Sequence, residues 1–427
     1  MRRLVLALFA APLALHAQPA SPPNPTNLWL VPLKWRGDEP TVGAPAKLTG
    51  DRGLNSQPSF SPDGRAIVFS ATRDTGQDAQ SDIWRIDLES GGERQVTHTP
   101  ENENSPTVNA RGEYVAVRWV PATLFKQYGP WVYDSAGRPL RGVLPMPDTT
   151  GYYVPLADGR WALTRPKSRS FTVAIYAPRT GVLSDIDSGV PALPAQRVPG
   201  TQALSWVRID SVGGRHRLWL YELTTGRRSL IGGTLPGRTA HVWVPGRHAI
   251  LMARGSTLYL RRTVGDTAWR AIATFTDPGL RHAAAYAVSP RGDQLIVTSP
   301  LRPPLAVALR DSLEAGRSAS DVAALMSAWR EAGRLGDYDV GEGALSSFAD
   351  ERGQRGRPAD AVTLHQAIVA LFPTSHRALA RLGDAQRSAG DTATAIATWR
   401  RALAANPRST DDDRRAAETL ERRLAGP

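Results

Sequence analysis

The sequence contains no cysteine, and only four of its 52 basic residues are lysine. The absence of cysteine excludes disulfide bonds, thiolate metal sites and a cysteine nucleophile. The net charge of +12 is therefore carried by arginine. These arginines are scattered rather than clustered with aromatic residues, so we expect no nucleic-acid partner. With 427 residues, 41% of them apolar, the chain can form two or three globular domains.

Long apolar runs are also missing after the first twenty residues, so we expect no transmembrane segment in the mature protein. At the N-terminus, Arg2 and Arg3 precede the apolar stretch 4–15, and the small residue Ala17 follows it. This is the pattern of a secretory signal peptide. We expect residues 1–17 to be a signal peptide and the mature protein to be periplasmic or secreted. An uncleaved membrane anchor is the alternative.

A unit of about 44 to 48 residues recurs within residues 18–302. Each unit has a short strand, a tight turn with glycine and a strongly apolar second strand, and most continue with two further strands. Glycine suits the turn because it adopts positive φ without a Cβ clash. The turn glycines are Gly64, Gly112, Gly159, Gly200, Gly246 and Gly292. Four antiparallel strands at this spacing predict an all-β propeller with six blades.

The sixth hairpin, residues 288–299, lacks its own third and fourth strands, because prolines and helical sequence follow it. The segments 27–33 and 45–49 resemble a third and a fourth strand. We therefore expect these two segments to complete the last blade and close the ring. Closure protects the strand edges of the first and last blades, which would otherwise expose unpaired backbone groups.

The first unit carries the most specific motif. It reads FSPDGRAIVFSATRD and then SDIWRIDLESGGERQVT. This resembles the TolB-like, PD40-type repeat, with its Ser-Pro-Asp-Gly turn, its Asp-Ile-Trp strand and its closing Val-Thr. The resemblance implies a six-bladed TolB-like propeller, a fold found in periplasmic proteins and in the propeller half of prolyl-oligopeptidase relatives.

From residue 303 onward the apolar spacing becomes helical. Residues 374–407 resemble a tetratricopeptide (TPR) repeat, with small residues such as Gly383 and Ala395 and the large Trp399 at the expected places. A weaker repeat lies near 340–373. We expect residues 303–427 to form an all-α, TPR-like domain. This segment has 17 basic and 17 acidic residues, so the net charge lies in the propeller segment.

Common catalytic and nucleotide-binding motifs, such as G-x-S-x-G, H-E-x-x-H and the P-loop, do not occur. In a propeller, the loops between blades converge on one mouth of the central channel. These loops and their flanks carry several charged residues, Glu103 and Asp187 among them. The candidate ligand-binding residues are Asp51, His98, Glu101, Asp148, Asp277, Arg281 and His282. Imidazoles and carboxylates can hold a divalent ion, but ordinary polar loops contain the same residue types. No spacing signature supports a metal site, so we predict no catalytic residue, no metal and no cofactor.

Two surfaces are candidate partner sites. The insertion 119–129 is rich in bulky apolar residues, and Leu124, Phe125 and Tyr128 are its candidate contacts, unless they pack under a neighbouring blade. On the helical domain, Arg377, Asp384 and Arg387 recur at helical spacing. They could bind a peptide, or they form a solvated helix face.

Taken together, the sequence favours a non-catalytic interaction scaffold with protein or peptide partners in the cell envelope. The alternative is a metal-dependent propeller enzyme, a lyase or hydrolase, with its site at the channel mouth near His98 and His282. The sequence indicates no oligomeric state.

Overall fold

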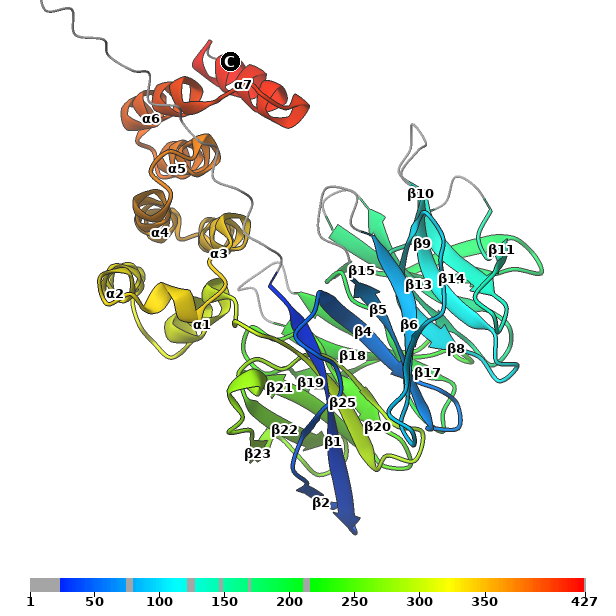
Figure 1. The fold of residues 1–427 in the computed structure, drawn as a ribbon. Helices are drawn as coiled ribbons and strands as arrows, with labels where there is room; N and C mark the ends of the chain where they lie inside the picture. The colour runs from blue at the N-terminus through cyan, green and yellow to red at the C-terminus, as the bar shows by residue number, and fades with distance from the viewer. Residues whose placement is uncertain are drawn as a thin grey trace, which may run out of the picture.

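The predicted fold class, a six-bladed all-β propeller followed by an all-α domain, is confirmed by the computed structural model (Figure 1). The structure describes residues 24–73, 80–120, 127–145, 149–167, 170–209 and 216–425. The predicted signal peptide lies outside these residues. The described residues form six antiparallel sheets, which are the six blades, and the helices follow them in the chain.

Five blades are built from consecutive strands. Blade 1 comprises β4 (Leu54–Phe60), β5 (Ala66–Thr72), β6 (Ser81–Asp87) and β7 (Glu93–Gln95). Blade 2 comprises β8 (Asn102–Val108), β9 (Tyr114–Val120), β10 (Gln127–Tyr133) and β11 (Pro139–Gly142). Blade 3 comprises β12 (Tyr152–Pro155), β13 (Trp161–Lys167), β14 (Ser170–Ala177) and β15 (Val182–Val190). Blade 4 comprises β16 (Gln196–Arg197), β17 (Ala203–Ile209), β18 (His216–Glu222) and β19 (Arg228–Gly233). Blade 5 comprises β20 (Val242–Val244), β21 (Ala249–Arg254), β22 (Thr257–Arg262) and β23 (Arg270–Thr274).

Blade 6 combines strands from both ends of the propeller segment. It comprises β24 (Ala284–Val288), β25 (Gln294–Pro300), β1 (Thr26–Arg36), β2 (Glu39–Val42) and β3 (Ala46–Lys47). Trp29 pairs with Val297 and Leu30 with Ile296, so β1 lies antiparallel to β25 (Figure 1). The outer edge differs from the single strand expected at 45–49. Because β1 is 11 residues long, β3 pairs with its first half and β2 with its second half.

The apolar second strands explain why the sheets stack. Residues 66–71 of β5 are all buried, which requires cover on both faces. Ile67 and Phe69 pack with Leu28 of blade 6, while Val68 packs with Tyr114 of blade 2. At the turns before these second strands, the six predicted glycines have φ between 72° and 85°, where a Cβ would be strained.

Within residues 305–424, all of which the structure describes, the chain forms seven α-helices. They are α1 (Leu305–Glu314), α2 (Ala319–Glu331), α3 (Glu342–Gln354), α4 (Pro358–Leu371), α5 (His376–Ser388), α6 (Thr392–Ala405) and α7 (Asp411–Leu424). The starts of α5 and α6 lie 34 residues after those of α3 and α4. A Cβ on Gly383 of α5 would clash with the Trp399 ring of α6, so glycine permits their close approach.

The helices stack in chain order and extend away from the propeller, with α1 nearest to it (Figure 1). Short 3₁₀ helices lie before β24 (η1, Pro278–Leu280) and after α2 (η2, Arg334–Asp337). None of the described helices is long and apolar enough to cross a membrane.

Candidate functional site

The residues predicted for the channel mouth each contact different neighbours in the structure. Asp51 accepts hydrogen bonds from Lys47 and from Asn27, and these contacts lower its pKa. Burial opposes ionisation of Glu101, but its ion pair with Arg118, 2.6 Å away, outweighs this and lowers its pKa. His98 lies close enough to Asp82 for its charge to favour the ionised form of that carboxyl.

The loop between blades 5 and 6 carries the other predicted charges. Asp277 caps η1 by accepting a hydrogen bond from Gly279 N at 2.8 Å, and Arg281 follows that helix. His282 lies near Arg238 and Asp311. Burial, assisted by the positive charge of Arg238, lowers the pKa of His282 to about 4. His282 therefore lies near the contact between Arg238 and Asp311, where the propeller meets α1.

The remaining predicted residues are placed as follows. Asp148, Leu124 and Phe125 lie outside the described residues. Tyr128 is half-buried in β10 and packs in the apolar cluster between blades 2 and 3.

The three predicted helical residues are all engaged within the chain. Arg377 pairs with Asp413 at 3.3 Å, and Asp384 pairs with Arg423 at 3.0 Å and accepts from Trp399 Nε1. The Arg387 guanidinium lies over the Trp399 ring.

A buried pair of carboxyl groups lies between blades 1 and 2. Asp82, the second residue of β6, and Glu103, the second residue of β8, are 7% and 0% exposed. The Thr97 hydroxyl faces both, at 3.1 Å from Asp82 Oδ1 and 3.2 Å from Glu103 Oε2, and it accepts from Ile83 N. One hydroxyl proton cannot satisfy two carboxylates, so this acidic cluster (Asp82, Thr97, Glu103) favours a bound proton.

The surroundings of Glu103 determine how tightly that proton is held. Burial, assisted by the charge of Asp82, raises the pKa of Glu103 to about 7. Hydrogen bonds donated by Thr99 and by Tyr133, the latter at 3.1 Å, act in the opposite direction. Burial also raises the pKa of Asp82, against the effects of Thr97 and His98.

A neutral cluster occupies the equivalent place between blades 6 and 1. Its members are Asn27, Thr49 and Asn55. Asn27 and Asn55 are the second residues of β1 and β4, as Asp82 and Glu103 are of β6 and β8, and Thr49 follows β3 by two residues as Thr97 follows β7. Thr49 accepts from Leu28 N at 3.0 Å and donates to Asn27 Oδ1 at 3.2 Å. Asn55 donates to Thr26 O at 2.6 Å. Thr49 therefore bonds to the third strand as Thr97 does, but Asn55 bonds to the backbone of β1 rather than to the threonine.

The first helix is held against blades 4 and 5 by ion pairs. Arg238, in the loop after β19, donates to both oxygens of Asp311 on α1, at 2.8 and 2.9 Å. Arg254 at the end of β21 approaches Asp311 at 3.4 Å and Glu314 at 3.6 Å. Both contacts of Arg238 come from the same terminal nitrogen, and hydrogen bonds between charged groups are among the strong ones. These contacts determine where α1 stands relative to the propeller.

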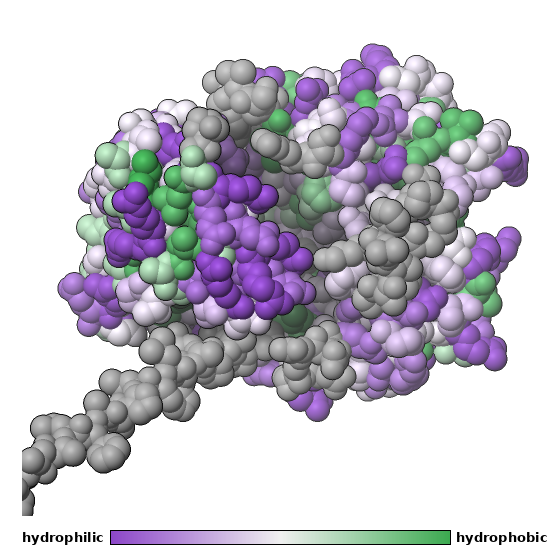
Figure 2. Space-filling view, turned by 90° about the horizontal axis from the view of Figure 1, so that it is seen from above, coloured by the Kyte–Doolittle hydropathy of each residue, from purple (hydrophilic) through white to green (hydrophobic). Residues whose placement is uncertain are grey.

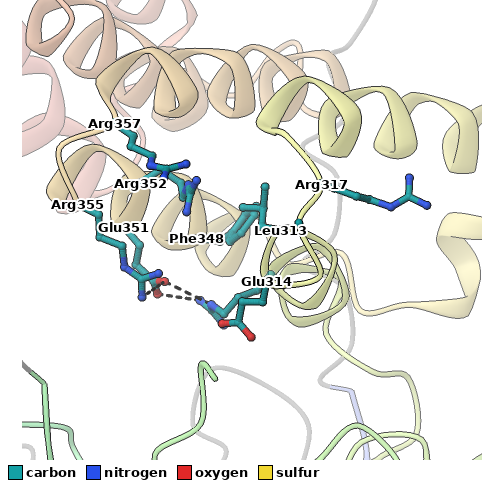
Figure 3. A pocket seen from close by; sticks show the side chains of 10 residues that line it. Leu313, Glu314, Arg317, Phe348, Glu351, Arg352, Arg355 and Arg357 are labelled. Carbon is teal, nitrogen blue, oxygen red and sulfur yellow. Dashed lines mark hydrogen bonds and ion pairs between the residues drawn. The ribbon is translucent and has the colours of Figure 1, made fainter. Parts of the chain in front are cut away.

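Two adjoining cavities lie beside this contact. The first interface cavity, of about 320 Å³, lies between the end of α1 and α3 (Figure 3). Its lining is Arg310, Leu313, Glu314, Gly316, Arg317, Phe348, Glu351, Arg352, Arg355 and Arg357. Arg310 pairs with Glu351 at 2.7 Å. Dashed lines mark the ion pairing of Glu351 in Figure 3. Arg352 and Arg357 lie side by side there, while Arg317 points away.

The second interface cavity, of about 650 Å³, shares Glu314 and Arg355 with the first and is otherwise lined by blade 4 and the loop that follows it. Its lining is His216, Arg217, Leu230, Gly233, Thr234, Leu235, Pro236, Gly237, Glu314 and Arg355. Burial and the charge of Arg355 lower the pKa of His216. Figure 2 shows the molecule from above, hollowed between the helices and the blades, with hydrophilic side chains bordering the hollow.

The sequence placed Glu103 among the loop charges, but it predicted neither its contact with Thr97 and Asp82 nor the interface cavities. Glu103 lies 21 residues after Asp82, and Arg310 lies 41 residues before Glu351. The signal in the sequence comes from aligning consecutive units, because Asp82 and Glu103 stand where the preceding units have Asn27 and Asn55. Among the described residues, no group of three or more histidine, aspartate and glutamate side chains could hold a metal ion.

No family model matches the chain, and no curated protein matches it. Solved structures do resemble it. A putative TolB from Agrobacterium tumefaciens is 13% identical, with 65% of this chain and 98% of that chain covered and a TM-score of 0.48. TolB from Acinetobacter baumannii is 18% identical over 49% of this chain, with a TM-score of 0.39, and the match spans 52% of that protein. An oligogalacturonate lyase from Vibrio parahaemolyticus is 11% identical, covers 60% and 80% of the two chains, and has a TM-score of 0.42. Similarities at this level carry no argument about family or activity.

Proposed function

We propose that this protein is a non-catalytic scaffold of the cell envelope, periplasmic or secreted, that binds a protein partner where the propeller meets the helices. One observation carries the proposal: the two interface cavities adjoin, and their walls come from α1, α3 and blade 4 together. Ion pairs between Arg238 and Asp311 hold the two domains in the arrangement that forms these walls. A preformed concave surface shared by two domains is a common place for a binding site.

We further infer that α3–α6 are two TPR-type repeats, near residues 340–373 and 374–407. The 34-residue offset between the helix pairs and the close contact of Gly383 with Trp399 support this reading. In such a stack each helix pair covers the next, and a terminal helix covers the last pair. Here α7 has that place, and its Arg423 pairs with Asp384 of α5.

The proposal is tested by crosslinking the tagged full-length protein in envelope preparations. The informative variant is Arg355→Glu, which reverses the charge of a residue lining both cavities. The matched control is Arg401→Glu, on the exposed side of α6 and outside both cavities. We expect the wild type and the control to capture the same partner and Arg355→Glu to lose it. Equal capture by all three proteins would refute binding at this interface.

Metal analysis of the purified full-length protein tests the alternative that it is a metal-dependent enzyme. A bound metal at one equivalent that disappears in both His98→Ala and His282→Ala would support that alternative. The structure places these histidines beside different partners, Asp82 for one and Arg238 for the other. We therefore expect no metal to depend on both.

A further inference from the structure

The charges around the interface cavities are unbalanced. Six arginines and two glutamates line them: Arg217, Arg310, Arg317, Arg352, Arg355 and Arg357, with Glu314 and Glu351. The chain from residue 303 onward has equal numbers of basic and acidic residues, so this excess is a local arrangement. A concave surface with one sign of charge concentrates ligands of the opposite sign.

The carboxylates of the two linings only partly neutralise Arg310, Arg352 and Arg355. Glu351 is shared between Arg310, at 2.7 Å, and Arg355, at 3.9 Å. Arg352 donates through one terminal nitrogen to Asp360 at 2.9 Å. Within the part of the chain that the structure describes, its buried Nε–H has no hydrogen-bond partner. A buried donor without an acceptor is costly, so Arg352 is not fully compensated by Asp360.

The same cavities also have apolar walls. Leu313 and Phe348 line the first, and Leu230, Leu235 and Pro236 line the second. Leu230 is 47% exposed, so its side chain is accessible to a ligand in the cavity. Phe348, the aromatic residue of the linings, is 2% exposed and offers no face on which a nucleic-acid base could stack. The ligand that fits therefore combines negative charge with apolar side chains.

We propose that the two interface cavities bind a segment of the partner protein in which acidic side chains alternate with apolar ones. This rests on the proposed scaffold function and names the chemistry of its partner. The acidic side chains pair with Arg355 and its neighbours, and an apolar side chain packs on Leu230. The shared lining residues Glu314 and Arg355 let one segment occupy both cavities.

The test uses fluorescence polarisation with the full-length protein and a labelled synthetic peptide of alternating Glu and Leu. A second peptide carries Gln in place of every Glu. We expect the Glu peptide to bind at least about tenfold more tightly, and its affinity to fall as salt is raised, because the pairing is between charges. Equal affinity for the two peptides would overturn the proposal.

Three variants locate the site. We expect Arg355→Ala to weaken binding by about tenfold or more, and Leu230→Ala by about threefold or more, as the loss of a partly exposed apolar contact implies. Arg401→Ala should bind like the wild type. Unchanged circular dichroism and melting temperature show that each variant is folded. Loss of affinity in Arg401→Ala equal to that in Arg355→Ala would reveal non-specific attraction and overturn the proposal.

Competition separates this ligand from other anions. We expect neither inorganic phosphate nor a single-stranded oligonucleotide to displace the Glu peptide at equal charge concentration. Displacement by either would overturn the assignment to an acidic peptide. If the peptide fails to bind while Arg355→Glu still loses its partner in envelope crosslinking, the ligand class is wrong and the scaffold function stands.

Discussion

The neutral cluster lies between blades 6 and 1, and the acidic cluster lies between blades 1 and 2. Both include a side chain that bonds to a strand backbone at a blade junction, but one cluster contains amides where the other contains carboxyls. In each, a threonine hydroxyl accepts from a backbone N–H of the third strand, at 3.0 Å from Leu28 N and 2.9 Å from Ile83 N. In each, that hydroxyl also faces the side chain that precedes this N–H in the strand. The neutral cluster does this without a titratable group at the buried positions.

The comparison shows that the blade contact requires hydrogen-bonding side chains and does not require charge. Ionised Asp82 and Glu103 would place two like charges together in a buried site, which is unfavourable without a cation or a proton. The acidic cluster therefore makes the stability of one blade junction depend on pH near neutrality, whereas the neutral cluster has no buried side chain that titrates there. Four sets of substitutions test this difference between the two clusters, and they are described in order of decreasing expected effect on stability.

The largest effect is expected when the neutral cluster is given a charge. Asn27 is 1% exposed and donates through Nδ2 to Asp51 at 2.7 Å. Asn27→Asp removes that donor and places a buried carboxylate beside Asp51. We expect the free energy of unfolding to fall by about 4 kcal/mol at pH 8, as measured by urea denaturation.

Adding Asp51→Asn to this variant serves as the control. It should restore much of the loss, because the amide can donate to the new carboxylate. If the double variant is no more stable than Asn27→Asp alone, repulsion from Asp51 is not the cause.

The second effect concerns the pH dependence of the acidic cluster. The pKa of Glu103 is about 7 in the folded protein and near 4.5 ordinarily, so the folded state binds the proton more tightly. The free energy of unfolding should therefore fall as pH rises from about 4.5 to 7 and level off above that range. The loss amounts to about 3 kcal/mol.

Glu103→Gln should remove most of this loss and be more stable than the wild type at pH 8. Urea denaturation at pH 5, 6, 7 and 8 measures it. The other charges near the cluster, those of His98, Glu101 and Arg118, remain in the variant. Parallel curves for the two proteins would show that Glu103 does not hold the proton.

The third effect compares the two threonines. Thr97→Val leaves Asp82, Glu103 and Ile83 N without a shared partner. We expect it to cost about 2 kcal/mol. Thr49→Val interrupts fewer contacts and should cost about 1 kcal/mol. Thermal unfolding of both variants at pH 7 measures the difference, and an equal cost would mean that the carboxyls do not depend on the hydroxyl.

The smallest effect is expected outside the buried clusters. Lys47→Ala removes the ion pair with Asp51, whose side chain is half exposed. Solvent screens this pair, so the loss of stability should not exceed about 0.5 kcal/mol. The pKa of Asp51, which Lys47 and Asn27 lower, should rise toward its ordinary value. NMR titration of the Asp51 carboxyl measures that rise, and an unchanged pKa would assign the shift to Asn27 alone.

The fold was predictable because its signals are local. A glycine at each hairpin turn, an apolar second strand and the 34-residue helical pattern can be read from neighbouring residues. The pairing of Trp29 with Val297 was also predictable, since the sixth unit lacks two strands that the N-terminal segment supplies. The division of the outer edge between β2 and β3 was not predictable, because it depends on how far β1 extends beyond its partner β25.

The candidate sites were much less predictable. The strand spacing predicted that His98 and His282 lie at the same mouth of the propeller channel. In the structure the charged groups near each histidine differ. Arg310 and Glu351 meet only because α1 and α3 pack together, and Asp311 meets Arg238 only because α1 stands on blade 5 and the loop before it.

By itself, the sequence determined the periodic features: the number of blades, the turn glycines and the change from strand to helix at about residue 303. These depend on hydrophobic spacing and backbone preference over a few residues. Only the tertiary structure decided which charges are buried together and which cavities form between the two domains. Burial and electrostatic interaction depend on distances between residues that lie far apart in the chain, and such distances leave no local pattern.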